Sequence, residues 1–327
     1  MRRTKQNAIN LGPSNFFKMT AVAFTLLSCL PANTTAQKPG QRAYSSPEDA
    51  ANALVTAAQT NDEKAMLDVL GPDGEQIVSS GDTVEDAQAR ANFVQRYQET
   101  HRLVKEPDGH IMLYVGAMNW PTPIPLVSKG KEWYFDSEAG KKEILFRRIG
   151  RNEISTIHVC RELVAAEKEY YSTQHNEYAQ QIFSDEGQHN GLYWKAAEGE
   201  PQSPIGPLVA SANAEGYKKG TNGPVTPYRG YYYRVLLRQG KNAPGGAKSY
   251  LVNGKMTEGF AFLAYPADYR STGVMTFVVS SDGVVYQRDL GRKTDVLAKT
   301  MKEYNPDSIW QKTEEEQTNV AAEQKTK

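Results

Sequence analysis

Two pairs of turn residues in the C-terminal half constrain the fold more than any other sequence feature. Asn253-Gly254 lies between the apolar segments 249–252 and 259–265, and Asp282-Gly283 lies between segments 274–280 and 284–288. Asn-Gly and Asp-Gly adopt the left-handed backbone that two-residue hairpin turns need. The flanking segments are therefore expected to pair as antiparallel strands, with the aromatic and β-branched segment 230–238 as a further strand of the same meander.

A helical pattern precedes this meander. Val159, Leu163, Ala166 and Tyr170 fall at the spacing of a single helix face, which predicts a long helix over residues 152–184. A shorter helical stretch begins near residue 137 and is expected to break at Gly150. Residues 203–208 contain two prolines and are expected to form a stiff loop. The C-terminal half is thus predicted to be a long helix packed on an antiparallel sheet.

The N-terminal half shows helix signals first and strand signals later. Ser46, Pro47 and the two acidic residues after them favour a helix start. Helices are predicted over residues 47–59, 63–70 and 84–101, and strands over residues 110–115, 124–127 and 132–135. Helices followed by a sheet indicate the α+β fold class.

The predicted organisation divides the chain into five segments. Residues 311–327 contain few apolar residues and no aromatic ones, so they are expected to form a disordered tail. The other four segments are a signal segment (1–36), a polar linker (37–45), an N-terminal α+β unit (46–149) and a unit of long helix and sheet (150–310).

The first 36 residues have the pattern of a bacterial secretory signal. Four basic residues and no acidic residue accompany an apolar run over residues 19–30, which is too short to span a bilayer. Two processing sites compete: a small-residue cleavage site before Gln37, and a lipobox-like sequence that would lipidate Cys29. We therefore expect an exported protein that is either periplasmic or tethered to a membrane through Cys29.

Removal of this segment changes the charge of the chain. The full sequence has 38 basic and 38 acidic residues, and loss of the four basic residues leaves 34 against 38, a formal charge of −4. This balance gives no basis for a nucleic-acid partner, and no second apolar stretch is long enough to span a membrane. Cys160 is the only cysteine besides Cys29, and its apolar neighbours predict a buried structural thiol.

Recognisable catalytic motifs are missing from the sequence. There is no G-x-S-x-G, and Ser128–Lys131 matches S-x-x-K without the partner motifs S-D-N and K-T-G. Neither H-E-x-x-H nor C-x-x-C occurs, and the glycine-rich residues 240–246 match no phosphate-binding motif. We therefore predict no catalytic, cofactor-binding or metal-binding residue and no cofactor.

Two polar clusters have alternative interpretations. His175, Asp185, Glu186 and His189 offer nitrogen and oxygen ligands to a transition metal, but without a spacing motif a polar helix end in solvent is favoured. The charged residues 147–153 could bind an anion or a partner through their arginines. They could instead tie the two units together, which is the interpretation we favour.

An aromatic run over residues 228–233 is a candidate interaction surface. Side chains alternate along a strand, so Tyr231 and Tyr233 are expected on one face and Tyr232 on the other. One face can then pack on the long helix while the other contacts a partner. The candidate surface consists of Tyr193, Trp194, Tyr228, Tyr231, Tyr232 and Tyr233.

Longer segments carry a family resemblance. The strings GLYW, SPIGPLVA, YRGYYYRVL and GVMTFVVSSDGVVYQRDLG resemble an uncharacterised bacterial family of exported proteins, classed as a domain of unknown function, and the resemblance extends from about Tyr44 to Trp310. It implies no activity and no catalytic residue. In their order of elements, the N-terminal unit also resembles NTF2-like domains, and the C-terminal unit resembles the globular part of a pilin or pseudopilin.

The sequence as a whole predicts an exported cell-envelope protein of unknown biochemical activity. The export signal, the missing catalytic motifs and the tyrosine-rich sheet favour a non-enzymatic binding or assembly module whose partner is an envelope protein or polymer. The alternative is an envelope hydrolase with an unrecognised carboxylate or metal site.

Overall fold

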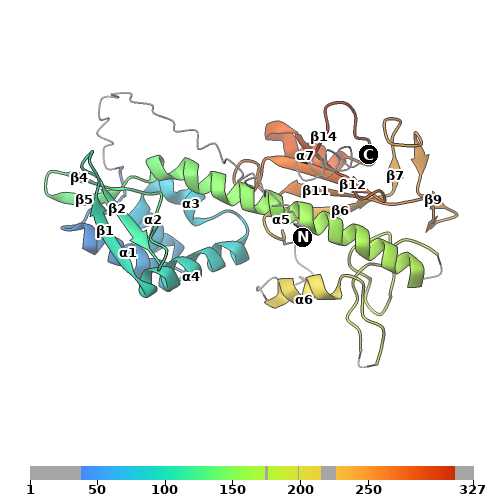
Figure 1. Cartoon of the computed structure of the whole chain (residues 1–327), viewed down its shortest axis with the longest axis horizontal. Coiled ribbons are helices and arrows are strands. Elements are labelled where there is room, and N and C mark those ends of the chain that lie inside the picture. Colours follow the sequence, from blue (N-terminus) through green and yellow to red (C-terminus); the bar gives the residue numbers. More distant parts are fainter. Residues whose placement is uncertain (1–37, 174–175, 198, 215–225, 314–327) are drawn as a thin grey trace, which may run out of the picture. The chain divides into compact units, whose positions relative to one another are not determined.

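A computed structural model describes residues 38–173, 176–197, 199–214 and 226–313 of the chain (Figure 1). The predicted signal segment and Cys29 lie outside these residues. Helices lead into a first antiparallel sheet, a long helix follows, and a second antiparallel sheet fills the C-terminal part. The α+β fold class predicted from the sequence is confirmed.

The N-terminal part packs helices against a small antiparallel sheet. Its strand order is β1-β2-β4-β5, with β3 paired to β2. Its core joins alanines of the first helix to Leu126 and Phe135 of the sheet. The elements are α1 (Pro47–Gln59), α2 (Glu63–Leu70), η1 (Pro72–Gly74), α3 (Glu75–Val78), α4 (Thr83–Glu99), β1 (His101–Lys105), β2 (Ile111–Val115), β3 (Trp120–Pro121), β4 (Leu126–Lys129) and β5 (Glu132–Phe135).

The helix starts follow the capping chemistry of the sequence. The Ser46 hydroxyl accepts a hydrogen bond from the Asp49 backbone N–H at 3.0 Å, and the Asp62 and Asp82 carboxylates cap α2 and α4 in the same way. Helices α1 and α2 have the predicted boundaries. The third helix was predicted too long, because His101 belongs to β1, a strand that the sequence analysis missed.

The long helix differs from its prediction at Gly150 and at its C-terminal end. One helix, α5, runs from Ser137 to Thr173 without a break at Gly150 and ends eleven residues before the predicted Ser184. Nothing lies within 4 Å of the position a Gly150 side chain would take, so the glycine costs only about 1 kcal/mol of helix propensity. Beyond the helix, Tyr178 forms a β-bridge with Met256. Pairing with the sheet has replaced further helix there.

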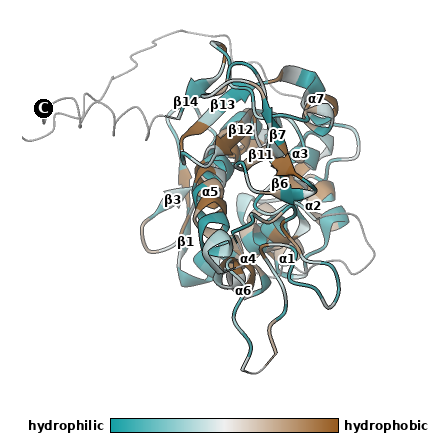
Figure 2. Ribbon diagram, turned by 90° about the vertical axis from the view of Figure 1, so that its right-hand side faces the viewer, coloured by the Kyte–Doolittle hydropathy of each residue, from teal (hydrophilic) through white to brown (hydrophobic). Residues whose placement is uncertain are grey.

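The C-terminal part is a five-stranded antiparallel sheet with α5 against one face. Its strand order is β14-β13-β12-β11-β6, and apolar residues concentrate in β6, β11, β12 and α5 (Figure 2). Val159, Cys160 and Leu163 of α5 belong to the same core as Phe262 and Phe277 of the sheet. The strands are β6 (Tyr231–Leu236), β7 (Arg238–Gln239), β8 (Lys248–Ser249), β9 (Leu251–Val252), β10 (Lys255–Met256), β11 (Ala261–Pro266), β12 (Met275–Ser280), β13 (Val285–Asp289) and β14 (Gln311–Lys312).

Both predicted turns exist, but one of them joins different strands. Gly283 has a φ of +78° between the paired strands β12 and β13, as expected. Asn253 and Gly254 have φ values of +51° and +81° and close the short hairpin of β9 and β10. The predicted partner of this turn, segment 259–265, instead pairs with β6 and β12 as β11.

Helices α6 (Gly206–Ala214) and α7 (Thr294–Thr300) and strand β14 were not predicted. The proline-rich segment expected as a loop begins α6, because a proline suits the first turn of a helix. The short η2 (Gly291–Lys293) leads into α7. Strand β14, at the start of the segment predicted as a disordered tail, pairs with β13. Residues 314–327 of that segment lie outside the described residues.

The segment predicted as a linker is packed against the N-terminal part. Gln41 is buried, and its side-chain amide donates hydrogen bonds to the carbonyls of Val69 and Phe135. Tyr44 pairs with Trp133 at the sheet. Across all the described residues, no helix combines the length and the apolar character that crossing a bilayer requires.

Candidate functional site

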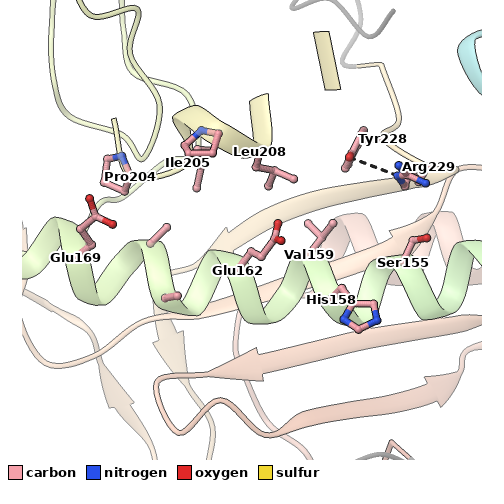
Figure 3. Close-up of a pocket in the computed structure, with 13 residues that line it drawn as sticks. Ser155, His158, Val159, Glu162, Glu169, Pro204, Ile205, Leu208, Tyr228 and Arg229 are labelled. Atoms are coloured by element: carbon pink, nitrogen blue, oxygen red, sulfur yellow. Dashed lines mark hydrogen bonds between the residues drawn. The ribbon is translucent and has the colours of Figure 1, made fainter. Parts of the chain in front are cut away.

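A groove of about 640 Å³ lies along α5, facing the segment that leads into α6 (Figure 3). The α5 side chains come from positions three or four residues apart, which share one helix face. Val159 and Ala166 form an apolar floor, and Ile205 and Leu208 form the opposite wall. The lining residues are Ser155, His158, Val159, Glu162, Ala165, Ala166, Glu169, Pro204, Ile205, Pro207, Leu208, Tyr228 and Arg229.

Acidic side chains give the groove its main charge. Glu162 and Glu169 extend from α5 toward the opposite wall (Figure 3), and their seven-residue spacing separates them by about 10.5 Å along the helix. Both residues are exposed, and neither carboxylate forms a hydrogen bond or ion pair with another residue that the structure describes. The two carboxylates are therefore available to a cationic ligand.

Tyr228 and Arg229 close the end of the groove away from Pro204 and Glu169 (Figure 3). The Arg229 Nε donates to the Tyr228 hydroxyl at 3.4 Å, and the guanidinium carbon lies 5.7 Å from the centre of the tyrosine ring. Arg229 has a φ of +50°, in the left-handed region that non-glycine residues adopt less often. This end of the groove therefore carries a positive charge against an aromatic ring.

The predicted tyrosine surface is distributed over both faces of the sheet. Tyr231 and Tyr233 share the α5 face: the Tyr231 ring lies 5.8 Å from that of Phe277, and the Tyr233 hydroxyl donates to Thr156 Oγ1 at 3.3 Å. Tyr232 lies on the other face, with its ring 5.5 Å from that of Tyr265. Tyr231 is fully buried, and burial raises the pKa of both Tyr231 and Tyr233 well above the usual value.

The remaining candidate aromatics pack near the end of α5. Trp194 is 6% exposed, its ring stacks on His189, and its indole N–H donates to the Pro201 carbonyl. Tyr193 is half-buried and meets Phe183 edge to face. Of the six candidate residues, only Tyr228 lines the groove.

The charged residues 147–153 of α5 contact both the N-terminal helices and the second sheet. Arg148 is buried and donates to the carbonyls of Gln76 and Ile77 at 2.8 and 2.9 Å. Glu153 lies five residues after Arg148 on the same helix. One of its carboxylate oxygens accepts hydrogen bonds from the backbone N–H groups of Val274 and Met275, both at 2.9 Å. Arg148 thus connects α5 to α3, and Glu153 connects it to the start of β12.

Further contacts complete this junction. Arg151 forms an ion pair with Glu85 of α4, and the Asn152 amide donates to the Thr272 carbonyl. The buried Asp82, besides capping α4, accepts a hydrogen bond from the Gly230 N–H at 2.9 Å. These contacts account for most of the cluster, so its charged groups serve structure as the sequence analysis favoured.

The candidate metal ligands do not converge. His175 lies outside the described residues, Asp185 accepts a hydrogen bond from the Asn190 amide, and His189 stacks on Trp194. No group of three or more His, Cys, Asp or Glu side chains in the described part of the chain could hold a metal ion. Ser128 of the S-x-x-K match lies in the β4–β5 hairpin, where a helical S-x-x-K arrangement cannot form.

A buried acid that the sequence analysis missed lies on the core side of α5. Glu167 is fully buried, and one carboxylate oxygen accepts a hydrogen bond from the Ala179 N–H at 2.9 Å while the other has no partner. Burial raises the pKa of Glu167 from 4.5 to about 8. The sequence offered one signal for this burial: Glu167 lies four residues after Leu163, on the apolar face of the predicted helix.

Cys160 is buried as predicted, in the core between α5 and the sheet. Removal from water disfavours the thiolate and raises the pKa of the thiol to about 12. A thiol in this state is a poor nucleophile at neutral pH.

Fold and groove together define an α+β protein with an open, charged cleft along its central helix. Comparison with protein families assigns it further: the family described as Protein of unknown function (DUF2950) matches residues 41–313. The chain belongs to this family, in agreement with the resemblance found in the sequence. Searches of curated proteins and of solved structures returned no match.

Proposed function

We propose that this protein is an exported binding module of the cell envelope, without enzymatic activity, that holds an envelope protein or polymer in the groove along α5. The observation that carries the proposal is the groove itself. At about 640 Å³, with an apolar floor and charged rims, it has the size and mixed lining of a ligand site. The pattern of the first 36 residues supports export.

The lining favours a partner with basic groups. Two exposed carboxylates on one helix face complement ammonium or guanidinium groups about 10 Å apart. The apolar floor at Val159 and Ala166 can receive the aliphatic part of such a partner. Electrostatic recognition of this kind weakens with salt, because exposed charges are screened.

A photo-crosslinking residue placed at Pro207, on the groove rim, tests this proposal in cells. Lys168 is exposed on α5 but outside the groove lining, and provides the matched control position. Three results together support the groove as the binding site. An adduct forms at position 207, the Glu162→Gln and Glu169→Gln double substitution reduces its yield, and no adduct forms at position 168. Equal crosslinking at both positions, or an adduct indifferent to the double substitution, refutes it.

The fate of Cys29 decides between a free and a tethered protein. We propose that the chain is exported in either case. Mass spectrometry of the mature protein distinguishes the outcomes: a lipidated Cys29 at the N-terminus indicates tethering, and an unmodified start at Gln37 indicates a periplasmic protein. An intact Met1 in the protein recovered from cells contradicts export.

A hydrolase is the second candidate, because the groove also holds two carboxylates and His158. Paired carboxylates in glycoside hydrolases are about 5–9.5 Å apart, whereas Glu162 and Glu169 start about 10.5 Å apart along the helix. Both are also exposed rather than enclosed. Loss of a measured hydrolytic activity on envelope polymers in Glu162→Gln, with binding retained, would favour the enzyme over the binding module.

A further inference from the structure

A second pocket, of about 410 Å³, lies on the sheet face opposite α5. Val278 of β12 and Arg288 of β13 line it from the sheet, and the segment after α7 covers it with Met301, Lys302 and Trp310. Arg238 adds a further positively charged side chain to the lining of the pocket. Three positive side chains thus line a pocket whose walls are partly polar and partly apolar.

Arg288 is the unusual group in this pocket. It lies opposite Thr276 in the β12–β13 register, so both side chains point to the same sheet face. Arg288 is half-buried, yet it forms no hydrogen bond or ion pair with any residue in the described ranges. Charged side chains withdrawn from water are normally paired. The guanidinium reaches solvent inside the pocket and is therefore free to bind a group that enters from outside the chain.

The acidic residues of the pocket compensate only part of this positive charge, because three cations and two carboxylates line it and leave a net formal charge of +1. Glu303 pairs with Arg238, at 3.5 Å between Oε2 and Nε. Asp307 uses one carboxylate oxygen to accept the Ile309 N–H at 3.0 Å. Lys302 is exposed and forms no ion pair within the described residues. Arg288 and Lys302 are thus the two lining cations that form no ion pair with another described residue.

We propose that this pocket is an anion site, in which Arg288 and Lys302 bind an oxyanion, the carboxylate or phosphate group of a small organic molecule. The planar guanidinium can bind two oxygens of such a group at once, and the lysine adds a second positive charge. Met301, Val278 and Trp310 contact the carbon part of the ligand. The site is separate from the groove along α5 and does not depend on the function proposed for it.

Side-chain NMR of the full mature chain tests the proposal with inorganic phosphate and acetate as probes. The Arg288 Nε–Hε signal, identified by its loss in Arg288→Gln, is expected to shift and saturate with one of the two anions at constant ionic strength. Saturation by phosphate identifies a phosphate ligand, and saturation by acetate a carboxylate. No shift of this signal up to 100 mM of either anion overturns the proposal.

Thermal unfolding provides an independent measurement. At about ten times Kd, the bound anion raises Tm of the wild type by roughly 2–4 °C. Arg288→Gln is expected to lose this increment, and Arg292→Gln, an exposed arginine just beyond β13, to retain it. Lys302→Gln removes an exposed charge without disturbing the fold and should weaken binding several-fold. Equal stabilisation of all four proteins is general salt stabilisation and contradicts the site.

Discussion

The buried Glu167 makes the stability of this protein depend on pH in a direction opposite to that of most carboxylates. The folded protein keeps Glu167 protonated up to a pKa of about 8, whereas the unfolded chain releases that proton near 4.5. Between these values the native state binds more protons than the unfolded state. The free energy of unfolding therefore falls as the pH rises through this window.

The magnitude follows from the same two values. Each pH unit between them costs up to 1.36 kcal/mol, so the full loss between pH 4.5 and about 8 approaches 5 kcal/mol. Glu167→Gln replaces the acid with a neutral group of the same shape that still accepts the Ala179 N–H. We expect the variant to match the wild type within about 1 kcal/mol at pH 5 and to be more stable by about 4 kcal/mol at pH 8.

Chemical denaturation followed by circular dichroism, at intervals from pH 5 to pH 8.5, measures this difference. Glu169→Gln is the matched control, because Glu169 is an exposed glutamate two residues further along the same helix. The control should follow the wild-type pH dependence. Parallel curves for wild type and Glu167→Gln, or a wild type that is the more stable protein at pH 8, would refute the assignment of a raised pKa to Glu167.

Four further predictions follow from the contacts described above. Arg234 donates to the carbonyls of Ala298 and Met301 at 2.6 Å and of Lys299 at 3.2 Å at the C-terminus of α7, so Arg234→Ala should cost about 2–3 kcal/mol in equilibrium unfolding. Gly230 has a φ of +75°, and a Cβ there would lie 2.6 Å from Asn152 Nδ2; Gly230→Ala should therefore lower Tm by several degrees, and an unchanged Tm would contradict the close approach. Cys160 should resist a thiol reagent at pH 8 until the protein unfolds, which the absorbance of the released thiolate reports. Glu162→Gln with Glu169→Gln should weaken binding of a lysine-containing peptide about 2–10-fold in low-salt calorimetry, whereas Glu138→Gln, in the first turn of α5 and outside the groove lining, should not.

Local signals in the sequence were sufficient for several elements. Ser46 with Pro47 identifies the start of α1, and Asp282-Gly283 identifies the hairpin of β12 and β13, because capping and turn conformations depend on neighbouring residues alone. The burial of Cys160 followed from its apolar neighbours for the same reason. The overall α+β class was correct because it depends on the order of such elements.

The candidate sites were less accessible to sequence reasoning. Tyr228 was the one predicted interaction residue that lines the groove, while Glu162, Glu169 and Arg229 carried no motif. Their significance comes from the opposite wall of the groove, which Ile205 and Leu208 provide from a segment more than 30 residues beyond the end of the helix. Arg288 and Trp310 likewise meet only because β13 and the segment after α7 cover the same sheet face.

The sequence by itself determined the helix caps, the turn positions, the family and the alternation of the tyrosines across the sheet, since each depends on residue type and spacing. The tertiary structure alone decided that α5 continues through Gly150 and ends at Thr173. Gly150 and the residues after Thr173 have weak local preferences, and contacts with α3, β10 and β12 outweigh them. Both pockets also depend on the tertiary structure, because their walls come from segments of the chain that only packing brings together.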